Sequence, residues 1–473
     1  MKIRVIRVIR AKKKKRKTMK KHFYIIGVAL TLSSCGIYTN YHQAEEVPAG
    51  LYGEEVQVNE ASNVAELSWK ELFTDPTLQA LIEQGLQNNT DLQSAQLRVE
   101  QAGAALLSAK LAYLPSFALA PQGTVSSFDK HEAVETYQLP VAASWQLDIF
   151  GGIRNAKKQA KAVYAQSQDY RQAVQTGVIC GIANVYYTLR MLDEQLSISQ
   201  ETECSWQETV DAMRAMMDAG MANEAAVAQL EAAHLGVKAS VLDLKEQINQ
   251  VENSLALMLA ETPQSISRAS WTESSFVVPE RLSVGLPVQL LANRPDVRAA
   301  ERSLEAAFYG TNAARSSFWP NITLNGTAGW TNSAGNAIIN PGKFLAAAVG
   351  SLTQPLFAQG QLAARYKIAK AQQEQASLAF TQALLNAGAE VNEAMVAYET
   401  SQKKSVLIAQ QVTALQKAYE STSLLMQHGN ITYLDVLTAR QSLLGAKLQQ
   451  SANRFMEIQS VINLYQSLGG GWN

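Results

Sequence analysis

The stretch that decides the fold is DLQSAQLRVEQAGAALLSAKLAYLPSFAL, positions 91–119, because it recurs 205 positions later as DVRAAERSLEAAFYGTNAARSSFWPNITL, positions 296–324. Seven positions are identical, and they include the prolines Pro115 and Pro320. A second block recurs at an offset of 209, where Gly220 matches Gly429. The chain is therefore two copies of one unit of roughly 200 residues, a period too long for a short-repeat solenoid.

Each copy opens with a helical pattern, over 75–114 and 287–319, that a proline ends. Two stretches of alternating hydrophobicity follow. In the clearest of them, 137–149, apolar residues take every second place, which predicts a strand with one apolar face and one largely polar face. The alternation predicts four strands, two in each copy, at about 117–126, 137–149, 322–330 and 344–357.

A much longer helical pattern follows each strand pair, over 154–219 and 361–428, and contains no proline. About 66 residues at about 1.5 Å each predict a rod of roughly 100 Å. Gly220 and Gly429 end the rods, and return helices are expected over 223–259 and 433–468. The pattern predicts two antiparallel helical hairpins with glycine at each tip. The many alanines suit either a plain coiled-coil stalk or a wide cylinder with water inside.

The first 34 residues predict an export signal. Twelve Lys and Arg residues and no acidic residue precede position 35, and the apolar stretch 23–32 then leads to Ser33, Ser34 and Cys35. Roughly ten apolar residues are too few to span a bilayer as a helix, so the segment is typical of a cleaved signal peptide, with Met19 as an alternative start. LSSC at 32–35 resembles the bacterial lipobox, which implies acylation of Cys35. The alternative is an ordinary signal peptide with an incidental cysteine.

Charge and motifs exclude several function classes. The whole chain has 41 Lys and Arg against 41 Asp and Glu, but without the twelve early cations only 29 basic residues remain. An acidic mature protein argues against nucleic acid as a partner. The chain contains no HExxH, Walker, GxSxG or CxxC motif, and its five histidines lack metal-ligand spacing. We therefore expect neither catalysis nor a metal site.

The strands require a partner. Amphipathic strands of this length match the about 9–11 residues that cross an outer membrane with a tilt. Four strands do not close a barrel within one chain, and lipid does not tolerate an open sheet edge, so closure demands several protomers. The alternative is a soluble β subdomain that caps a helical rod.

Three further motifs carry a resemblance to a known family: WKELFTDPTL at 69–78, LP at 286–287 through NRPDVRAAE at 293–301, and GNITYLDVL at 429–437. With the doubled unit of helix, strand pair and helical hairpin, they resemble the TolC/OprM outer-membrane factors, specifically the NodT-type lipoproteins that serve resistance-nodulation-division (RND) efflux pumps. The resemblance implies a mainly α fold with a membrane β-barrel portion. In it, a homotrimer forms one twelve-stranded barrel, four strands from each chain, and a periplasmic helical tunnel.

The resemblance also implies a division of the chain and a set of partners. Small molecules would pass passively to the outside, driven by an inner-membrane RND pump, and a periplasmic adaptor protein would dock at the tips, Gly220 and Gly429. The expected partners are the chain itself as a homotrimer, the adaptor, the pump and outer-membrane lipid, with no cofactor apart from the lipid on Cys35. The segments are a signal peptide (1–34), an N-terminal equatorial segment (35–74), a first repeat (75–260), an equatorial linker (261–286), a second repeat (287–468) and a tail (469–473).

The tip of the second hairpin is the expected entrance. Asp435 matches an acidic position that rings the periplasmic entrance in the family, and three carboxylates there would attract cations. The alternative is a solvated carboxylate near a helix N-terminus, where the helix dipole favours it. Thr438, Met426 and Ile431 stand where the TolC pattern has a second aspartate, a gate tyrosine and a locking arginine. This implies that apolar packing around Met426 and Ile431 replaces a salt-bridge latch.

Two other functions fit the same pattern. A duct for protein or peptide secretion uses the same architecture, although the Arg-Pro-Asp block at 294–296 favours small-molecule efflux. A lipid-anchored coiled scaffold, which bridges envelope layers without conducting, would form neither a trimer nor a pore.

Overall fold

The computed structural model describes residues 38–43, 47, 50–53, 67–127, 129, 132–269, 276, 292–334, 337–428 and 432–471. Contacts divide the chain into two compact units, each of which is described by itself. Unit 1 comprises 1–43, 101–164 and 302–378, and it holds all the described strands. Unit 2 comprises 44–100, 165–301 and 379–473, and it holds the two helical hairpins.

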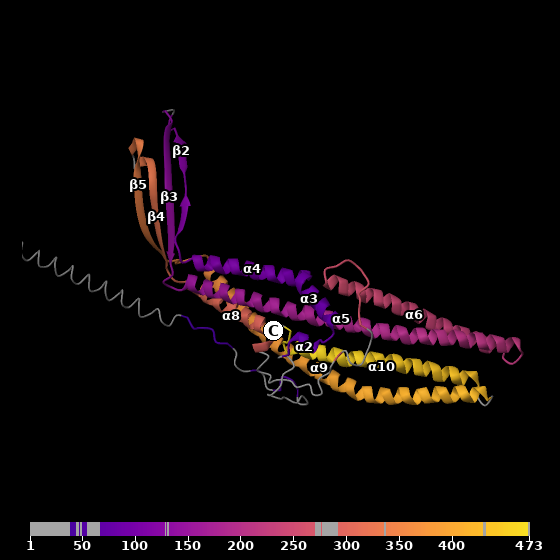
Figure 1. Ribbon diagram of the computed structural model, residues 1–473. Coiled ribbons are helices and arrows are strands. Elements are labelled where there is room, and N and C mark those ends of the chain that lie inside the picture. The colour runs from indigo at the N-terminus through magenta and orange to yellow at the C-terminus, as the bar shows by residue number, and fades with distance from the viewer. Residues whose placement is uncertain are drawn as a thin grey trace, which may run out of the picture. The chain divides into compact units, whose positions relative to one another are not determined.

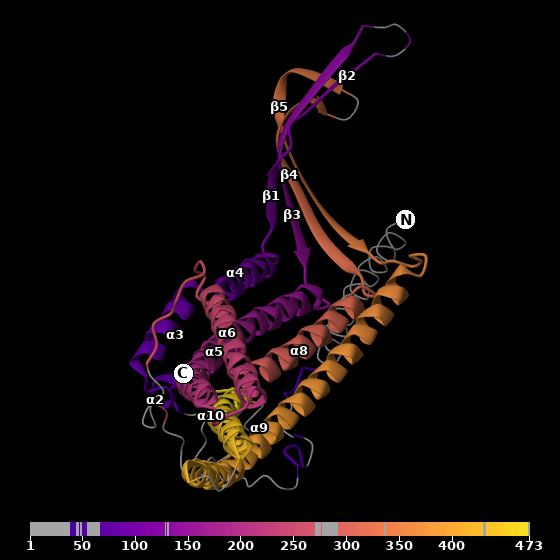
Figure 2. The same ribbon diagram turned by 90° about the vertical axis from the view of Figure 1, so that its right-hand side faces the viewer.

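Unit 1 is built on one antiparallel sheet with the strand order β1-β3-β4-β5, and β2 also pairs with β3. Ser116 of β1 lies opposite Ser144, and Gln122 of β2 lies opposite Gln138, so β1 and β2 follow the same register along β3. In Figures 1 and 2 the strands run side by side as a curved ribbon. The strands are β1 (Ser116–Leu119), β2 (Gln122–Ser126), β3 (Val134–Leu147), β4 (Asn321–Ala334) and β5 (Ala337–Thr353).

The sheet has one apolar and one polar face, as the alternation in the sequence predicts. On the polar face the Ser144 hydroxyl donates to Asn325 Oδ1 at 2.8 Å. On the other face Leu139 lies opposite Trp330, which in turn lies opposite Phe344. Large apolar side chains of this face are exposed in the single chain: Phe117, Leu119, Leu139, Val141, Trp145, Leu324, Trp330, Phe344 and Leu352. The apolar face therefore has no cover within the described part of one chain.

The strand boundaries differ from the predicted ones. The strand predicted over 117–126 is broken between Leu119 and Gln122, because Pro121 has no N–H to donate to β3. The strand predicted over 344–357 begins seven residues earlier and ends four residues earlier, since β5 pairs with β4 from Ala337 to Thr353. Sheet pairing thus overrides the noisy side-chain pattern at its ends. β3 and β4 also depart from 137–149 and 322–330 by two to four residues at some ends.

The helices of the two copies match residue for residue, which confirms the twofold repeat. In Figure 1 α6 returns along α5, and α10 returns along α9, so the two predicted hairpins are present. The matched pairs are α4 (Thr90–Leu111) with α8 (Pro295–Ser316) at an offset of 205, and α5 (Gly152–Asp218) with α9 (Gln361–Gln427) and α6 (Glu224–Met258) with α10 (Tyr433–Ser467) at an offset of 209.

The first helical segment is more broken than predicted. The pattern over 75–114 is two helices, α3 (Pro76–Asn88) and α4, with Asn89 between them. Asp75 caps α3, because its Oδ1 accepts from Thr77 N at 2.9 Å. α2 (Trp69–Leu72) precedes them, and its four residues are too few to show a helical period. In the second copy α8 begins at Pro295, Arg294 interrupts the helical segment before it, and Ala292 and Asn293 are again helical. The predicted start at 287 lies outside the described residues, as do all of 287–291.

None of the described helices is both long enough and apolar enough to cross a membrane.

Candidate functional site

The tip of the first hairpin is a tight turn at Gly220, where the sequence predicts it. Gly220 N donates to Met217 O at 2.9 Å, and Met221 N donates to Met216 O at 2.8 Å, the two bonds of a Schellman helix end. The φ angle of Gly220 is +74°, a conformation that strains any residue with a Cβ atom. Asn223 then caps α6, because its side chain accepts from Ala226 N at 2.8 Å. The tip is thus set by local hydrogen bonds.

The tip of the second hairpin is described in part. Gly429 and Ile431, predicted as tip and gate residues, lie outside the described residues, as does Cys35. Met426 is half-buried in the last turn of α9, and Thr438 is exposed on α10, where its hydroxyl donates to Leu434 O at 2.9 Å. The apolar latch expected around Met426 and Ile431 therefore stays a prediction.

Asp435 lies at the third position of α10 and completes a capping box with Thr432. Asp435 Oδ2 accepts from Thr432 N at 3.0 Å and from the Thr432 hydroxyl at 2.6 Å. These hydrogen bonds lower the pKa of Asp435, whose side chain is exposed. The carboxylate is therefore anionic at neutral pH, caps the start of α10 and presents its charge to water. The ring of three carboxylates at the entrance stays a prediction.

Behind the tips, the hairpins share an apolar cluster. Trp206, Val210 and Met213 of α5, Val227 and Leu230 of α6, and Leu437 of α10 are buried together. Tyr433, the first residue of α10, packs against the same cluster. Burial raises the pKa of Tyr433 to about 12, against the lowering influence of Arg440 and of a hydrogen bond with Thr209. The start of the second return helix is therefore seated on the first hairpin.

Arg440 ties the two hairpins together beside this cluster. Its guanidinium carbon lies 5.1 Å from the centroid of Trp206 on α5 and 5.7 Å from that of Tyr419 on α9. Arg440 Nη1 also donates to Ser205 O at 3.3 Å and to the Thr209 hydroxyl at 3.1 Å. Only 9% of Arg440 is exposed. A desolvated cation over aromatic rings contributes more to the stability of the contact than a solvent-exposed cation does.

The sequence analysis missed Arg440, although a signal was present. Tyr433, Leu437 and Arg440 follow one another at spacings of four and three, so the cation stands on the apolar stripe of α10. The matching position in the first copy is Glu231, which bonds Arg214 of its own hairpin at 2.5 Å. The contact of Arg440 with the other hairpin therefore has no counterpart in the first copy of the repeat.

The Arg-Pro-Asp-Val-Arg block begins α8 and holds its start in place. Arg294 donates to both carboxylate oxygens of Asp296, at 2.9 and 2.6 Å. Arg294 Nη1 also donates to Glu390 of α9 at 2.7 Å and to Ser467 O, at the end of α10, at 2.9 Å. The side chain of Arg294 is 7% exposed. The motif that carries the resemblance is thus a structural junction of three helices.

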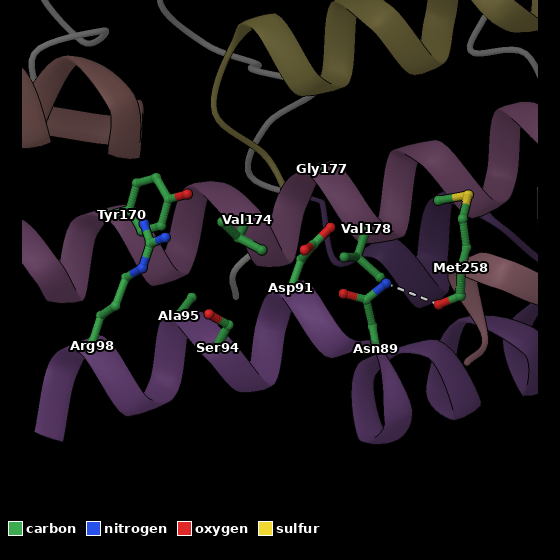
Figure 3. Close-up of a pocket in the computed structure, with 10 residues that line it drawn as sticks. All are labelled: Asn89, Asp91, Ser94, Ala95, Arg98, Tyr170, Val174, Gly177, Val178 and Met258. Atoms are coloured by element: carbon green, nitrogen blue, oxygen red, sulfur yellow. Dashed lines mark hydrogen bonds between the residues drawn. The ribbon is translucent and has the colours of Figure 1, made fainter.

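The first copy repeats one of these bonds with a neutral side chain. Asn89, which matches Arg294, donates Nδ2 to Met258 O at the end of α6 at 2.9 Å, and Met258 matches Ser467. Figure 3 shows this bond at one end of an open cleft of about 460 Å³ between α4 and α5. Farther along the cleft Arg98 lies over the ring of Tyr170, 5.3 Å from its centroid. The residues that line the cleft thus take part in contacts that pack the helices of the first copy together.

Within the described ranges, no group of three His, Cys, Asp or Glu side chains could hold a metal ion. The two described cysteines, the buried Cys180 and the exposed Cys204, are free thiols. At the hairpin tips the structure provides an exposed carboxylate, Asp435, and a buried cation, Arg440, that joins the two hairpins.

Comparisons with known proteins agree with this geometry. The model of the family described as outer membrane efflux protein matches residues 81–261 and 286–470. The cation efflux system protein CusC of Escherichia coli is 27% identical over 449 residues, which are 94% of this chain and 97% of that protein. The antibiotic efflux pump outer membrane protein ArpC of Pseudomonas putida is 26% identical and covers 94% of each chain.

Solved structures share the fold. A crystal structure of CusC has a TM-score of 0.83 at 25% identity and covers 92% of this chain and 100% of its own. The open-state structure of the Neisseria gonorrhoeae channel MtrE has a TM-score of 0.83 at 27% identity and covers 92% and 98%. Because the family model spans most of the chain in two matched halves, the protein belongs to the outer membrane efflux protein family and is an efflux channel of the outer membrane.

Proposed function

We propose that three copies of this chain close one β-barrel and one helical tunnel, through which small molecules leave the cell. The observation that carries the proposal is the sheet of unit 1. The apolar face is uncovered, and in the described part of the chain no further strand pairs with the outer edges of β1, β2 and β5. Open edges are not tolerated in lipid. Since β1 and β2 continue one another, three chains of four strands give a closed barrel of twelve.

The channel is the passive part of a tripartite pump. CusC and ArpC are named as components of a cation efflux system and of an antibiotic efflux pump. By analogy, an inner-membrane RND pump supplies the energy and a periplasmic adaptor protein docks at the hairpin tips, Gly220 and Gly429. The family consists of efflux channels. At the hairpin tips, the exposed carboxylate of Asp435 and the buried guanidinium of Arg440 support a role in ion selection and gating.

Asp435 sets the charge preference of the entrance. Its carboxylate is exposed and its pKa is lowered, so three copies place three negative charges at the tips of a trimer. Such a ring attracts cations and repels anions. In the first copy Ala226 occupies the matching place, so each chain contributes one carboxylate.

Charge reversal at Asp435 tests both the pore and the ring. Purified full-length protein is expected to have the mass of a trimer and to conduct cations in a planar bilayer, while Asp435→Lys inverts the preference to anions. Asp435→Asn, which removes the charge without adding one, should abolish the preference. Glu246→Lys, the same charge change at an exposed site within α6, is the control and should stay cation-selective. Unchanged selectivity in Asp435→Lys would remove the ring, and a monomer without conductance would remove the channel itself.

A covalent lipid on Cys35 is the second anchor that we propose. Tyr38 is the first described residue, and its hydroxyl donates to Phe150 O at 2.8 Å, where β3 leads into α5. Three residues span at most about 11 Å, so a lipid on Cys35 would enter the membrane close to the end of the sheet.

Palmitate labelling tests this anchor. Radiolabelled palmitate is expected to enter the wild-type protein and Cys204→Ser, whose cysteine is exposed, but not Cys35→Ser. Labelling that persists in Cys35→Ser would show that the lipid is attached to another residue.

A further inference from the structure

One end of the sheet in unit 1 joins the long helices. Ser116 pairs with Ser144, and Asn321 pairs with Thr353, so the starts of β1 and β4 and the ends of β3 and β5 lie together. α4 and α8 lead into this end, and α5 and α9 leave it. Large apolar side chains around it are exposed, and we call them the apolar belt: Phe117, Trp145, Phe318, Trp319, Leu356 and Phe357.

Two residues of the belt are the most exposed large apolar side chains in the described part of the chain. Leu356 and Phe357 are 95% and 87% exposed. The proposed function places the apolar face of the sheet in lipid, so the belt continues a surface that acyl chains cover. Aromatic side chains at such a boundary are typical of the membrane–water interface.

Positive charge is concentrated next to the belt. The segments 108–116, 145–161, 312–321 and 353–370 contain nine Lys and Arg residues and one acidic residue, Asp148. Asp148 is engaged locally, because it accepts from Ile153 N and Arg154 N at the start of α5. The chain beyond position 35 has an acidic excess, 29 basic against 41 acidic residues. Eight of the nine cations are exposed, and six of them form what we call the basic collar: Lys110, Arg154, Lys157, Arg315, Arg365 and Lys367.

The contacts of Lys157 connect the basic collar to the apolar face. Lys157 Nζ lies 5.5 Å from the ring centroid of Tyr113. Tyr113 O in turn accepts from the indole nitrogen of Trp145 at 2.8 Å, and Trp145 belongs to the apolar face of β3. Tyr113 thus contacts both an ammonium group and an indole at the rim of the apolar face. Cations and aromatic amphipathic side chains are both typical of the headgroup region of a membrane.

We propose that the basic collar binds the phosphate groups of anionic phospholipids in the periplasmic leaflet of the outer membrane, with their acyl chains against the apolar belt. The proposal rests on the proposed placement of the sheet in the membrane. Charge favours this leaflet, because the described residues at the opposite end of the sheet include three acidic ones, Asp129, Glu132 and Glu135, and one cation, Lys343. Each cation at such a surface attracts anionic lipid by about 1 kcal/mol.

Lipid counting by native mass spectrometry tests the collar. Full-length protein in detergent is mixed with phosphatidylglycerol or phosphatidylcholine, and bound lipids are counted. Phosphatidylglycerol is expected to bind at least about tenfold more tightly than phosphatidylcholine, and its binding should weaken with salt. The triple variant Lys157→Gln, Arg365→Gln, Lys367→Gln should bind it about 10- to 100-fold more weakly.

A matched variant removes three exposed cations from the helices of unit 2: Lys238→Gln, Lys404→Gln, Lys417→Gln. It should bind phosphatidylglycerol as the wild type does. Equal binding by the two triple variants, or equal binding of phosphatidylglycerol and phosphatidylcholine by the wild type, would overturn the proposal. Both triple variants should conduct ions like the wild type. Weaker lipid binding with unchanged conductance would therefore leave the proposed channel unaffected, whereas a wild-type protein that does not conduct would refute the channel.

Discussion

Replacement of Arg440 with methionine is expected to raise the open probability of the channel about 10- to 100-fold. We expect the entrance to open by movement of the second hairpin away from the first, and the buried Arg440 joins the two hairpins. Methionine keeps much of the volume but loses the hydrogen bonds to Ser205 O and Thr209 and the cation over Trp206. A desolvated cation–π contact contributes about 2 kcal/mol, and about 1.4 kcal/mol is a factor of ten. Single-channel recording at a fixed voltage measures the change.

The control for Arg440→Met is Arg214→Met. Arg214 lies on α5 and bonds the carboxylate of Glu231, but it is half exposed and joins helices of one hairpin only. An exposed pair of this kind contributes about 0–1 kcal/mol, so the gating should stay as in the wild type. Arg440→Lys should fall between the two, because lysine keeps the charge without the flat guanidinium. If Arg440→Met opened no more often than Arg214→Met, Arg440 would have no part in the gate.

Replacement of Arg294 with methionine is expected to destabilise unit 2 by about 3 kcal/mol, the lower end of the range for breaking a buried ion pair. The change leaves Ser467 O without its donor and removes the partner of Asp296 and Glu390. The side chains of Asp296 and Glu390 are about half exposed, so water solvates the two carboxylates in the variant and reduces the destabilisation. Thermal unfolding followed by circular dichroism should show a lowered midpoint. The control Lys403→Met, which breaks an exposed pair with Glu399, should leave the midpoint unchanged.

The effect of Arg294→Met should depend on pH. Burial alone would raise the pKa of Asp296, but the hydrogen bonds and charge of Arg294 outweigh it and leave the pKa below the ordinary 3.8. A carboxylate with a lowered pKa stabilises the fold above its unfolded pKa, and the contribution disappears as the pH falls through the folded pKa. The gap in midpoint between wild type and Arg294→Met should therefore narrow below about pH 4. A gap that stays constant in acid would exclude Asp296 from the stabilisation.

Local pattern predicted much of the fold. The helix period and the absence of proline placed α5 and α9 within two residues of their ends, and the alternation in β3 identified the apolar face. The break at Pro121 and the early start of β5 were missed, because hydrogen bonding to a neighbouring strand decides strand ends. At the tips the sequence predicted the turn at Gly220, which the structure contains, and the role of Asp435 at the entrance, which stays a prediction. It did not identify Arg440 as the residue that joins the hairpins.

The sequence by itself determined the repeat, the long hairpins, the strands and the family, because each leaves a mark within a few neighbouring residues or in a copy of itself. Only the tertiary structure decided what the buried cations do. Arg440 meets Thr209 across 231 positions, and Arg294 meets Ser467 across 173. No periodicity links positions so far apart. A buried cation must find its partners wherever folding places them, so its role follows from packing rather than from its sequence neighbours.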